Sequence, residues 1–170
     1  FLVDVDNTLL DNDRVKNAIK QSLARVLGVS EAEHFWRHHD SFREYAKLVD
    51  FPTITRTYCA ERDAKTCEIT VGTIFDSIDF ASALYPRALA ALQYLKTLGS
   101  VFIFSEGDMV YQRKKIEESG IAAAADGVFL FEHKLEHLDE IKKQFASAGF
   151  IFIDDRDAKL MEIKRSFSDA

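Results

Sequence analysis

Two aspartates at the end of an apolar run are the first residues whose type and spacing could support chemistry. Asp4 and Asp6 occur in the pattern Asp-Val-Asp-Asn-Thr, directly after the apolar start of the sequence. On an extended strand, a spacing of two turns both side chains to the same side. Two carboxylates held close together repel one another, so a site that contains both favours a cation or a shared proton. A solvated turn after a strand is the alternative interpretation.

A second pair of acids follows another apolar run. Asp154 and Asp155 come directly after Phe150–Ile153, where two adjacent carboxylates are costly unless a positive charge compensates them. The alternative is that Asp155 or Asp157 caps the next helix while Arg156 screens the pair. Taken with the first pair, these acids form the oxygen-rich set of ligands that Mg²⁺ prefers.

Three further polar residues also follow apolar runs. Ser105 ends the run that begins at Val101, where its hydroxyl and the next backbone N–H groups could hold phosphate oxygens. Glu106 brings an acid to the same place, which either weakens phosphate binding or points to solvent. Lys134 follows the run Val128–Phe131, and its ammonium could neutralise a phosphate. Taken singly, Ser105 or Asp108 is more typical of a cap on the helix that follows, and Lys134 of a solvated surface residue.

The elements that must position these residues are four short apolar runs. Each is nearly continuous rather than alternating, which is typical of strands covered on both faces. The runs are Phe1–Val5, Val101–Ser105, Val128–Phe131 and Phe150–Ile153. Helical patterns accompany them at Tyr111–Ser119, Leu135–Ala148 and Asp157–Phe167, and a further helix with Pro86 in its first turn precedes the second run. This alternation predicts a parallel α/β sheet, which binds ligands at the carboxyl ends of its strands.

A stretch of about eighty residues separates the first strand from the helix that leads into the second strand, which is far longer than a crossover loop. Its composition is mostly helical, in the segments Asp13–Leu27, Ser30–Leu48 and Thr53–Asp76. We expect Gly28, Pro52 and Gly72 to separate these segments, whereas Thr66–Ile74 fits either a strand or a helix. The sequence therefore predicts an α/β core over residues 1–12 and 84–170 and an inserted, mainly helical subdomain over residues 13–83.

The composition bears on several classes of protein. Apolar residues make up 47% of the 170 residues, which excludes a disordered chain, and the net charge of −6 argues against a nucleic-acid partner. The sequence shows neither a membrane span nor a signal peptide, so we expect no membrane partner. Cys59 and Cys67 are too few for a disulfide framework and fit a reducing compartment, so we expect a cytoplasmic location. Because the sequence starts in mid-strand without Met, we expect a few native residues before Phe1.

In their order along the chain, the four motifs resemble those of the haloacid dehalogenase-like hydrolase superfamily. They are Asp4-Val5-Asp6-Asn7-Thr8, Ser105, Lys134 and Asp154-Asp155. The resemblance covers Phe1–Leu10 and roughly Leu84–Lys164, with the insert where that family carries a helical C1-type cap. It implies a Rossmann-like, three-layer core and a cap over the carboxyl edge that selects substrates. Two departures from the family are Glu106 beside Ser105 and the absence of the further strand that usually follows the last helix.

The resemblance also implies a role for each acidic residue. Asp4 would be the nucleophile that attacks phosphorus and becomes an aspartyl-phosphate. Asp6 would first protonate the leaving oxygen and then activate water, and its backbone carbonyl would bind the metal. Asp154 and Asp155 would complete the Mg²⁺ site with Asp4, and the sequence does not decide which of the two binds the ion directly.

The remaining site residues are expected to bind the phosphate and the substrate. Ser105 would donate a hydrogen bond to the phosphate, and Lys134 would neutralise its charge together with the metal. Thr8 would steady the loop or Asp4. We also place Glu106 at the substrate site, because it adjoins Ser105 in the chain.

The resemblance favours a Mg²⁺-dependent phosphatase, a phosphoric monoester hydrolase acting on a small phosphorylated metabolite. Haloacid dehalogenases of the family lack an acid at the position of Asp6. The alternatives are a phosphomutase, a phosphonatase or a catalytically weak phosphate-binding regulatory protein. A phosphonatase would need a Schiff-base lysine from the insert, which contains Lys16, Lys20 and Lys47. A receiver-type phosphoacceptor is a further alternative, and the oligomeric state is left open.

Overall fold

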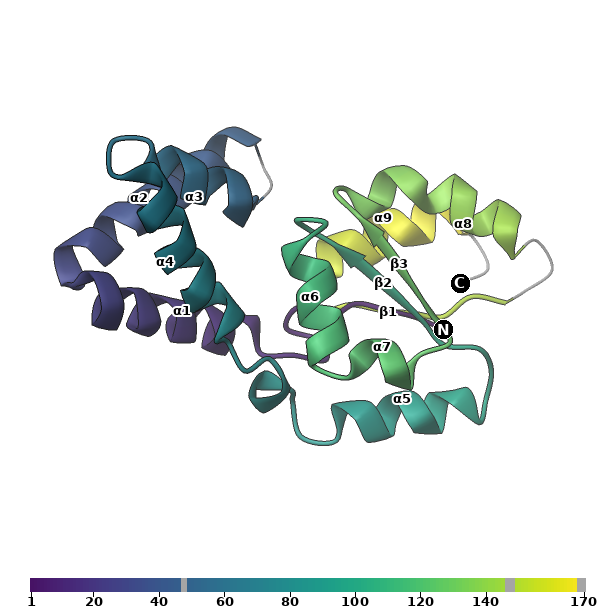
Figure 1. The fold of residues 1–170 in the computed structure, drawn as a ribbon. Coiled ribbons are helices and arrows are strands. Elements are labelled where there is room, and N and C mark those ends of the chain that lie inside the picture. The colour runs from purple at the N-terminus through teal and green to yellow at the C-terminus, as the bar shows by residue number, and fades with distance from the viewer. Residues whose placement is uncertain (47–48, 146–148, 168–170) are drawn as a thin grey trace. The chain divides into compact units, whose positions relative to one another are not determined.

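The computed structural model describes residues 1–46, 49–145 and 149–167. It divides the chain into two compact units, one formed by residues 1–11 with 81–170 and the other by residues 12–80. The second unit therefore starts one residue before the expected insert and ends three residues before its expected end. Figure 1 shows the sheet-containing first unit and the helical second unit.

Four parallel strands form the sheet of the first unit. They are β1 (Leu2–Val3), β2 (Phe102–Glu106), β3 (Gly127–Phe131) and β4 (Phe152–Ile153). The strand order is β3-β2-β1-β4, and Leu2 of β1 pairs with Phe102 on one side and Phe152 on the other. The predicted parallel α/β core is confirmed, and each strand lies within two residues of the run that predicted it.

Helices cover both faces of this sheet, as Figure 1 shows. The helices on one side are α5 (Ala88–Lys96), α6 (Tyr111–Glu118) and α7 (Ile121–Ala124), and those on the other are α8 (Leu138–Gln144) and α9 (Asp157–Ser166). Leu2 and Phe104 of the sheet pack in one buried cluster with Ile141 of α8 and Ile163 of α9. Burial on both faces explains why the strand sequences are continuously apolar.

Three details of the first unit differ from the expectations. The segment expected to be one helix from Leu135 starts as a 3₁₀ turn, η2 (Lys134–His137), which precedes α8, and residues 146–148 of the expected helix lie outside the described residues. Pro86 precedes α5 instead of entering its first turn, because Arg87 adopts a left-handed φ of 68° directly before the helix. The short helix α7 and a 3₁₀ turn, η1 (Ala81–Ala83), were not predicted.

The described part of the second unit, residues 12–46 and 49–80, contains four helices. They are α1 (Asn12–Leu27), α2 (Val29–Ala46), α3 (Phe51–Cys59) and α4 (Ala64–Asp76). Gly28 separates α1 from α2 at a φ of 91°, which glycine adopts without the strain of a side chain. Asp50 begins α3 by accepting a hydrogen bond from the backbone N–H of Thr53 at 2.8 Å, with Pro52 in the first turn.

The helix α4 corrects one expectation and decides another. Gly72 lies inside α4, so the break predicted there is wrong, and the expected helix Thr53–Asp76 divides instead between Cys59 and Ala64. Thr66–Ile74, which fitted either a strand or a helix, belongs to α4. Val71, Ile74 and Phe75 are buried in this unit, and their helical spacing outweighs the low helix propensity of one glycine.

A disulfide joins Cys59 at the end of α3 to Cys67 in α4, with a Cα–Cα distance of 5.6 Å. This bond was not predicted from the two cysteines. The bond closes a short loop around the turn between the two helices.

No helix among the described residues is both long and apolar enough to cross a bilayer.

We expect reduction of this disulfide to destabilise the protein by about 2–3 kcal/mol, the loop-closure contribution for a loop of this size. Thermal denaturation followed by circular dichroism, with and without a reductant, measures the change. A variant with both Cys59→Ala and Cys67→Ala is the control, because reductant should not change its melting temperature. A wild-type melting temperature that is independent of reductant would contradict a stabilising bond.

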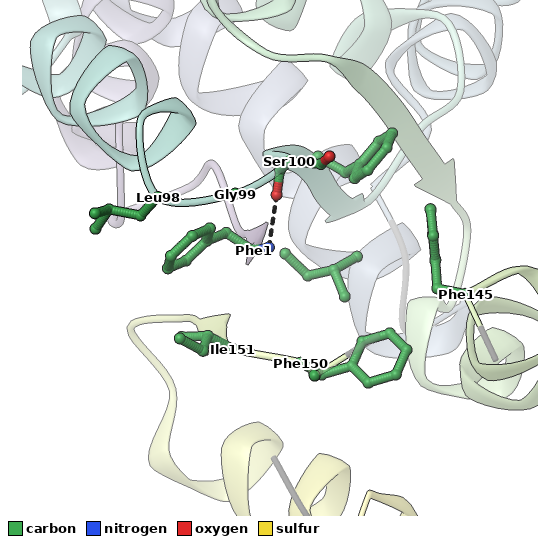
Figure 2. Close-up of a pocket in the computed structure, with 10 residues that line it drawn as sticks. Phe1, Leu98, Gly99, Ser100, Phe145, Phe150 and Ile151 are labelled. Atoms are coloured by element: carbon green, nitrogen blue, oxygen red, sulfur yellow. Dashed lines mark hydrogen bonds between the residues drawn. The ribbon is translucent and has the colours of Figure 1, made fainter. Parts of the chain in front are cut away.

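A hollow of about 460 Å³ lies at the amino ends of β1, β2 and β4 (Figure 2). Its walls include Phe1, Leu98, Phe145, Phe150 and Ile151, and the backbone nitrogen of Phe1 donates to the carbonyl of Ser100 at 2.8 Å. None of the site residues predicted from the sequence lines it. Those residues follow the strands, so they lie at the opposite edge of the sheet.

Candidate active site

Asp4 and the acid pair Asp154–Asp155 meet at the carboxyl edge of the sheet. The backbone N–H of Asp4 donates to the carbonyl of Ile153 at 2.8 Å, which places Asp4 beside the end of β4. One carboxylate oxygen from each of Asp4, Asp154 and Asp155 lies within 4.8 Å of the other two. Asp4 is only 3% exposed. The pairing of β1 with β4 thus brings together the acids from the two ends of the sequence.

Lys134 lies at the centre of this cluster. Its ammonium donates to Oδ1 of Asp4 and to Oδ2 of Asp154, each at 2.6 Å, and to the carbonyl of Phe104 at 3.0 Å. The residue belongs to η2, which follows β3, and is 1% exposed. Lys134 is therefore not the solvated surface residue that its type alone favours. It connects the ends of three neighbouring strands through one buried positive charge.

Burial raises the pKa of Asp4 to about 6. The adjacent ammonium of Lys134 opposes this rise, because it stabilises the ionised form, whereas the negative charges of Asp154 and Asp6 add to it. Asp4 can therefore serve as an anionic nucleophile at neutral pH without a separate base.

The raised pKa of Asp4 predicts that the metal-free protein loses stability as the pH rises. The folded protein holds the Asp4 proton between the unfolded-state pKa of 3.8 and the folded-state pKa of about 6. The stabilisation is therefore complete below the lower value and lost as the pH passes the higher one, a change of about 3 kcal/mol. Because Asn does not titrate, the stability of Asp4→Asn should rise relative to wild type from pH 4 to pH 7. Urea unfolding in a chelator measures the difference.

The control for this comparison is Asp139→Asn, which removes an exposed carboxylate from α8. A constant difference between Asp4→Asn and wild type across the pH range would show that Asp4 titrates normally in the folded protein.

Asp6 is anchored by Lys115, which was not among the predicted site residues. Its Oδ1 accepts a hydrogen bond from Nζ of Lys115 at 2.7 Å. The side chain of Lys115 is 3% exposed and that of Asp6 is 31% exposed. Asp6 stands in a tight turn, because the next residue, Asn7, adopts a left-handed φ of 61° and the N–H of Leu9 donates back to the carbonyl of Val5.

Ser105, the last residue but one of β2, is buried, and its hydroxyl is already oriented. Nε2 of Gln112 donates to its Oγ at 3.0 Å, which leaves the Ser105 proton to be donated to another group. Gly107 follows at a φ of 145° and allows the chain to turn into the next helix. The carboxylate of Asp108 accepts hydrogen bonds from the N–H groups at the start of α6. Of the two cap residues considered, Ser105 and Asp108, Asp108 is therefore the one that caps α6.

Glu106 is paired with two cations. Its Oε1 lies 3.0 Å from a guanidinium nitrogen of Arg156, and Glu106 also forms an ion pair with Lys159 of α9. Burial of Glu106 favours its neutral form, but the hydrogen bond and charge of Lys159 hold the pKa of this carboxyl below its usual range. The negative charge of Glu106 is therefore compensated and does not oppose an anion near Ser105.

The acid pair does not cap α9 in the way considered from the sequence. Arg156 holds the cap position without a side-chain cap bond, and its backbone N–H donates to Oδ1 of Asp154 at 2.9 Å. Its guanidinium lies 3.9 Å from the same oxygen, so it contributes to screening Asp154.

Thr8 forms the turn through its backbone, whose N–H donates to the carbonyl of Val5 at 3.2 Å. Its buried Oγ1 has no hydrogen-bond partner among the residues that the structure describes. The expected contribution of Thr8 to holding Asp4 stays a prediction.

One helix supplies two of the residues that sequence reasoning missed. Gln112 and Lys115 lie three positions apart on α6, on the same buried face as Tyr111 and Ile116. The sequence signal that could have identified them is the helical spacing that places a glutamine and a lysine on the same helix face as apolar residues. Arg156, which precedes α9, and Lys159 of α9 compensate Glu106, and they were missed because Glu106 lies on β2, about fifty residues earlier in the chain.

The acidic cluster fits a hard cation. Oδ2 of Asp4 is buried and has no hydrogen-bond partner within the described part of the chain, although Oδ1 is engaged by Lys134. Such an atom requires a ligand or a proton. Asp4, Asp154 and Asp155 offer only oxygen donors, which suits a cation such as Mg²⁺ and not a softer metal.

An aspartate after the first strand, a lysine after the third and an acid after the fourth thus meet at one edge of the sheet in this Rossmann-like core. A model of the haloacid dehalogenase-like hydrolase family matches residues 1–158. The chain belongs to this family.

Solved structures of similar fold agree with this assignment. A protein assigned as a haloacid dehalogenase-like hydrolase from Burkholderia xenovorans is 31% identical, with a TM-score of 0.88, over 98% of this chain and 76% of the other. Two structures at 14% identity share the fold. The Bacillus subtilis hydrolase YfnB, bound to magnesium, has a TM-score of 0.59 over 89% and 74% of the chains. The L-2-haloacid dehalogenase of Xanthobacter autotrophicus has a TM-score of 0.51, over 89% of this chain and 66% of the dehalogenase. No curated protein matches the sequence.

Proposed function

We propose that this protein is a Mg²⁺-dependent phosphatase that hydrolyses a small phosphorylated metabolite through an aspartyl-phosphate on Asp4. The observation that carries the proposal is the second acid, Asp6, which lies two residues from Asp4 and is held at 2.7 Å by Lys115. A nucleophile alone would serve several reactions of this family, whereas a second, anchored carboxylate serves reactions that move a proton.

The leaving group separates phosphate esters from haloacids. A halide departs as a stable anion and needs no proton, whereas an alkoxide leaving from phosphorus is strongly basic and needs one. Asp6 supplies a group for that proton transfer. The similarity to the Xanthobacter dehalogenase, at 14% identity, concerns the fold and not the reaction.

Two steps account for hydrolysis. In the first, a carboxylate oxygen of Asp4 forms a bond to phosphorus, the ester P–O bond breaks, and the leaving oxygen takes the proton of Asp6. In the second, the Asp6 carboxylate accepts a proton from water as the water oxygen bonds to phosphorus. The bond between Asp4 and phosphorus then breaks, which returns the Asp4 carboxylate and releases inorganic phosphate.

The surrounding residues manage charge during these steps. Mg²⁺ held by Asp4, Asp154 and Asp155 would supply compensation for the negative charge of the phosphate. Lys134 provides a fixed positive charge 2.6 Å from Oδ1 of Asp4, and Ser105 has a hydroxyl proton free for a phosphate oxygen. We assign Thr8 and Glu106 to the surroundings of this site, with Glu106 paired to Arg156.

The helical unit is proposed to select the substrate. A phosphonatase would use one of its lysines as a Schiff base, but Lys16 pairs with Asp13 at 3.1 Å and Lys20 lies 4.5 Å from the centre of the Trp36 ring. Neither is the buried, desolvated amine that such chemistry favours. Lys47 lies outside the described residues.

A cytoplasmic location stays a prediction. The disulfide argues against it, because such bonds persist mainly in oxidising compartments.

A panel of phosphate esters, assayed with Mg²⁺ and with a chelator, tests the proposal. We expect inorganic phosphate from several sugar phosphates, none from phosphonates, no halide from 2-haloacids, and loss of turnover in the chelator. The variants Asp154→Asn and Asp155→Asn should weaken Mg²⁺ binding measured by calorimetry, and Asp139→Asn serves as the control. Halide release without phosphate release would overturn the proposal, and undiminished Mg²⁺ affinity in both variants would overturn the metal assignment.

A further inference from the structure

We propose that Lys115 is a positioning residue that holds the Asp6 carboxylate in place for proton transfer. The inference rests on the proposed phosphatase function and adds to it a residue outside the four motifs that define the family resemblance. Lys115 contacts Asp6, which in turn would exchange protons with the leaving oxygen and with water, so Lys115 acts through another residue.

The two partners differ in how firmly each is held. Lys115 is rooted in α6, where its side chain is 3% exposed and its neighbours Tyr111 and Ile116 are buried. Asp6 stands on the turn after β1 with 31% of its side chain exposed. The rigid partner is therefore the lysine, and the partner with rotational freedom is the aspartate.

The energetics favour this pairing in both directions. A buried ammonium is costly unless an opposite charge compensates it, so Lys115 requires a carboxylate at a defined place. A partly exposed aspartate on a turn otherwise samples several rotamers. The 2.7 Å contact restricts Asp6 to the rotamer that faces the helix.

Position matters because the same carboxylate would serve twice. A general acid or base must come within hydrogen-bonding distance of the atom that gains or loses the proton. The helix α6 also holds Ser105 through Gln112 at 3.0 Å. One helix thereby sets the places of the phosphate donor and of the proton-transfer group relative to each other.

A purely structural ion pair is the alternative, and the choice of leaving group distinguishes the two. p-Nitrophenolate leaves without protonation, so forming the aspartyl-phosphate from p-nitrophenyl phosphate does not need Asp6 as an acid. An alkyl phosphate needs it in the first step, and both substrates need Asp6 as a base in the second. If Lys115 positions Asp6, its loss slows the steps that need proton transfer by Asp6 and spares the formation of the aspartyl-phosphate from p-nitrophenyl phosphate. If its loss distorts the whole site, every step is slowed.

The experiment is rapid-mixing kinetics of Lys115→Met with both substrates. We expect the rate of the first p-nitrophenolate burst to stay within about threefold of wild type, with about one equivalent released per site, followed by slow turnover. The rate of alkyl phosphate hydrolysis and the rate of p-nitrophenyl phosphate turnover after the burst should both fall by about 10- to 100-fold. Lys115→Arg, which retains a cation, should recover part of the loss.

Lys114→Met is the matched control, because Lys114 precedes Lys115 on the same helix and pairs with Glu118 at 2.7 Å. Its kinetics should match those of wild type. In an Asp6→Asn background, adding Lys115→Met should change the rate by less than about twofold, since the positioned group is gone. If Lys115→Met does not fold, Lys115→Gln replaces it.

The outcomes separate the two proposals. Equal losses in the burst and in alkyl phosphate hydrolysis, or losses that multiply with Asp6→Asn, would overturn the role of Lys115 and leave the phosphatase function standing. A wild-type protein that releases no phosphate from any ester would overturn the proposed function and, with it, this inference.

Discussion

Phosphate release should fall by roughly a thousandfold or more in Asp4→Asn, because the substitution removes the nucleophile and retains the size of the side chain. The carboxylate that would bond to phosphorus is 3% exposed and receives a hydrogen bond from Lys134 at 2.6 Å. An amide in the same place neither attacks phosphorus nor carries the negative charge that Lys134 and a metal compensate. Steady-state phosphate release and the trapping of a covalent phosphoenzyme from labelled substrate measure the effect.

The comparison requires that Asp4→Asn still folds. Its far-ultraviolet circular dichroism spectrum and its unfolding transition in chelator provide that check, and Asp139→Asn, on the exposed surface of α8, is the matched acid-to-amide control. Phosphate release at the wild-type rate, or a phosphoenzyme that persists in the variant, would show that phosphorus is not transferred to Asp4.

The second large effect is expected for Lys134→Met. Its removal leaves the carboxylates of Asp4 and Asp154, with side chains 4% and 2% exposed, facing each other without the ammonium between them. Breaking a buried charge cluster in this way costs about 3–5 kcal/mol. Activity should fall by about 100- to 1000-fold, because the fixed positive charge at the reacting carboxylate is lost.

Mg²⁺ gives this prediction a specific signature. A cation bound by the acids replaces part of the missing charge, so Mg²⁺ should raise the stability of Lys134→Met more than that of wild type in urea unfolding. Lys143→Met, which removes an exposed lysine from α8, should behave like wild type. Equal Mg²⁺ effects in Lys134→Met and wild type would mean that Lys134 and the metal do not share the same acids.

The sheet and the acids at its edge could be predicted because both depend on local signals. A continuous apolar run followed by acids, as in Phe150–Ile153 before Asp154, indicates a buried strand and the polar edge it reaches. The strand order, which places β1 beside β4, then brings Asp4 next to Asp154. The order of the strands cannot be derived from the sequence, but both acid pairs could be expected at the same edge because parallel strands bind ligands at their carboxyl ends.

The partners of the site residues could not be predicted, because they depend on contacts between distant segments. Lys115 resembles any other lysine of a charged helix until the fold places it 2.7 Å from Asp6, 109 residues away in the chain. On one of the two interpretations of the sequence, the negative charge of Glu106 weakens phosphate binding, but in the fold Arg156 pairs with this carboxylate. At Gly72 the local signal gave a wrong prediction. Glycine has a low helix propensity, but the burial of the apolar residues around it stabilises α4 through this position.

The central place of β1 in the sheet has a consequence for biosynthesis. Asp4 is translated 130 residues before its partner Lys134, and β4, which flanks β1, is translated later still. The helical unit is contiguous in the chain, from residue 12 to residue 80, and can fold while the rest is being translated. Long-range pairing makes the sheet the slower unit to assemble. The nascent chain can therefore carry a folded helical unit before the residues of the candidate site come together.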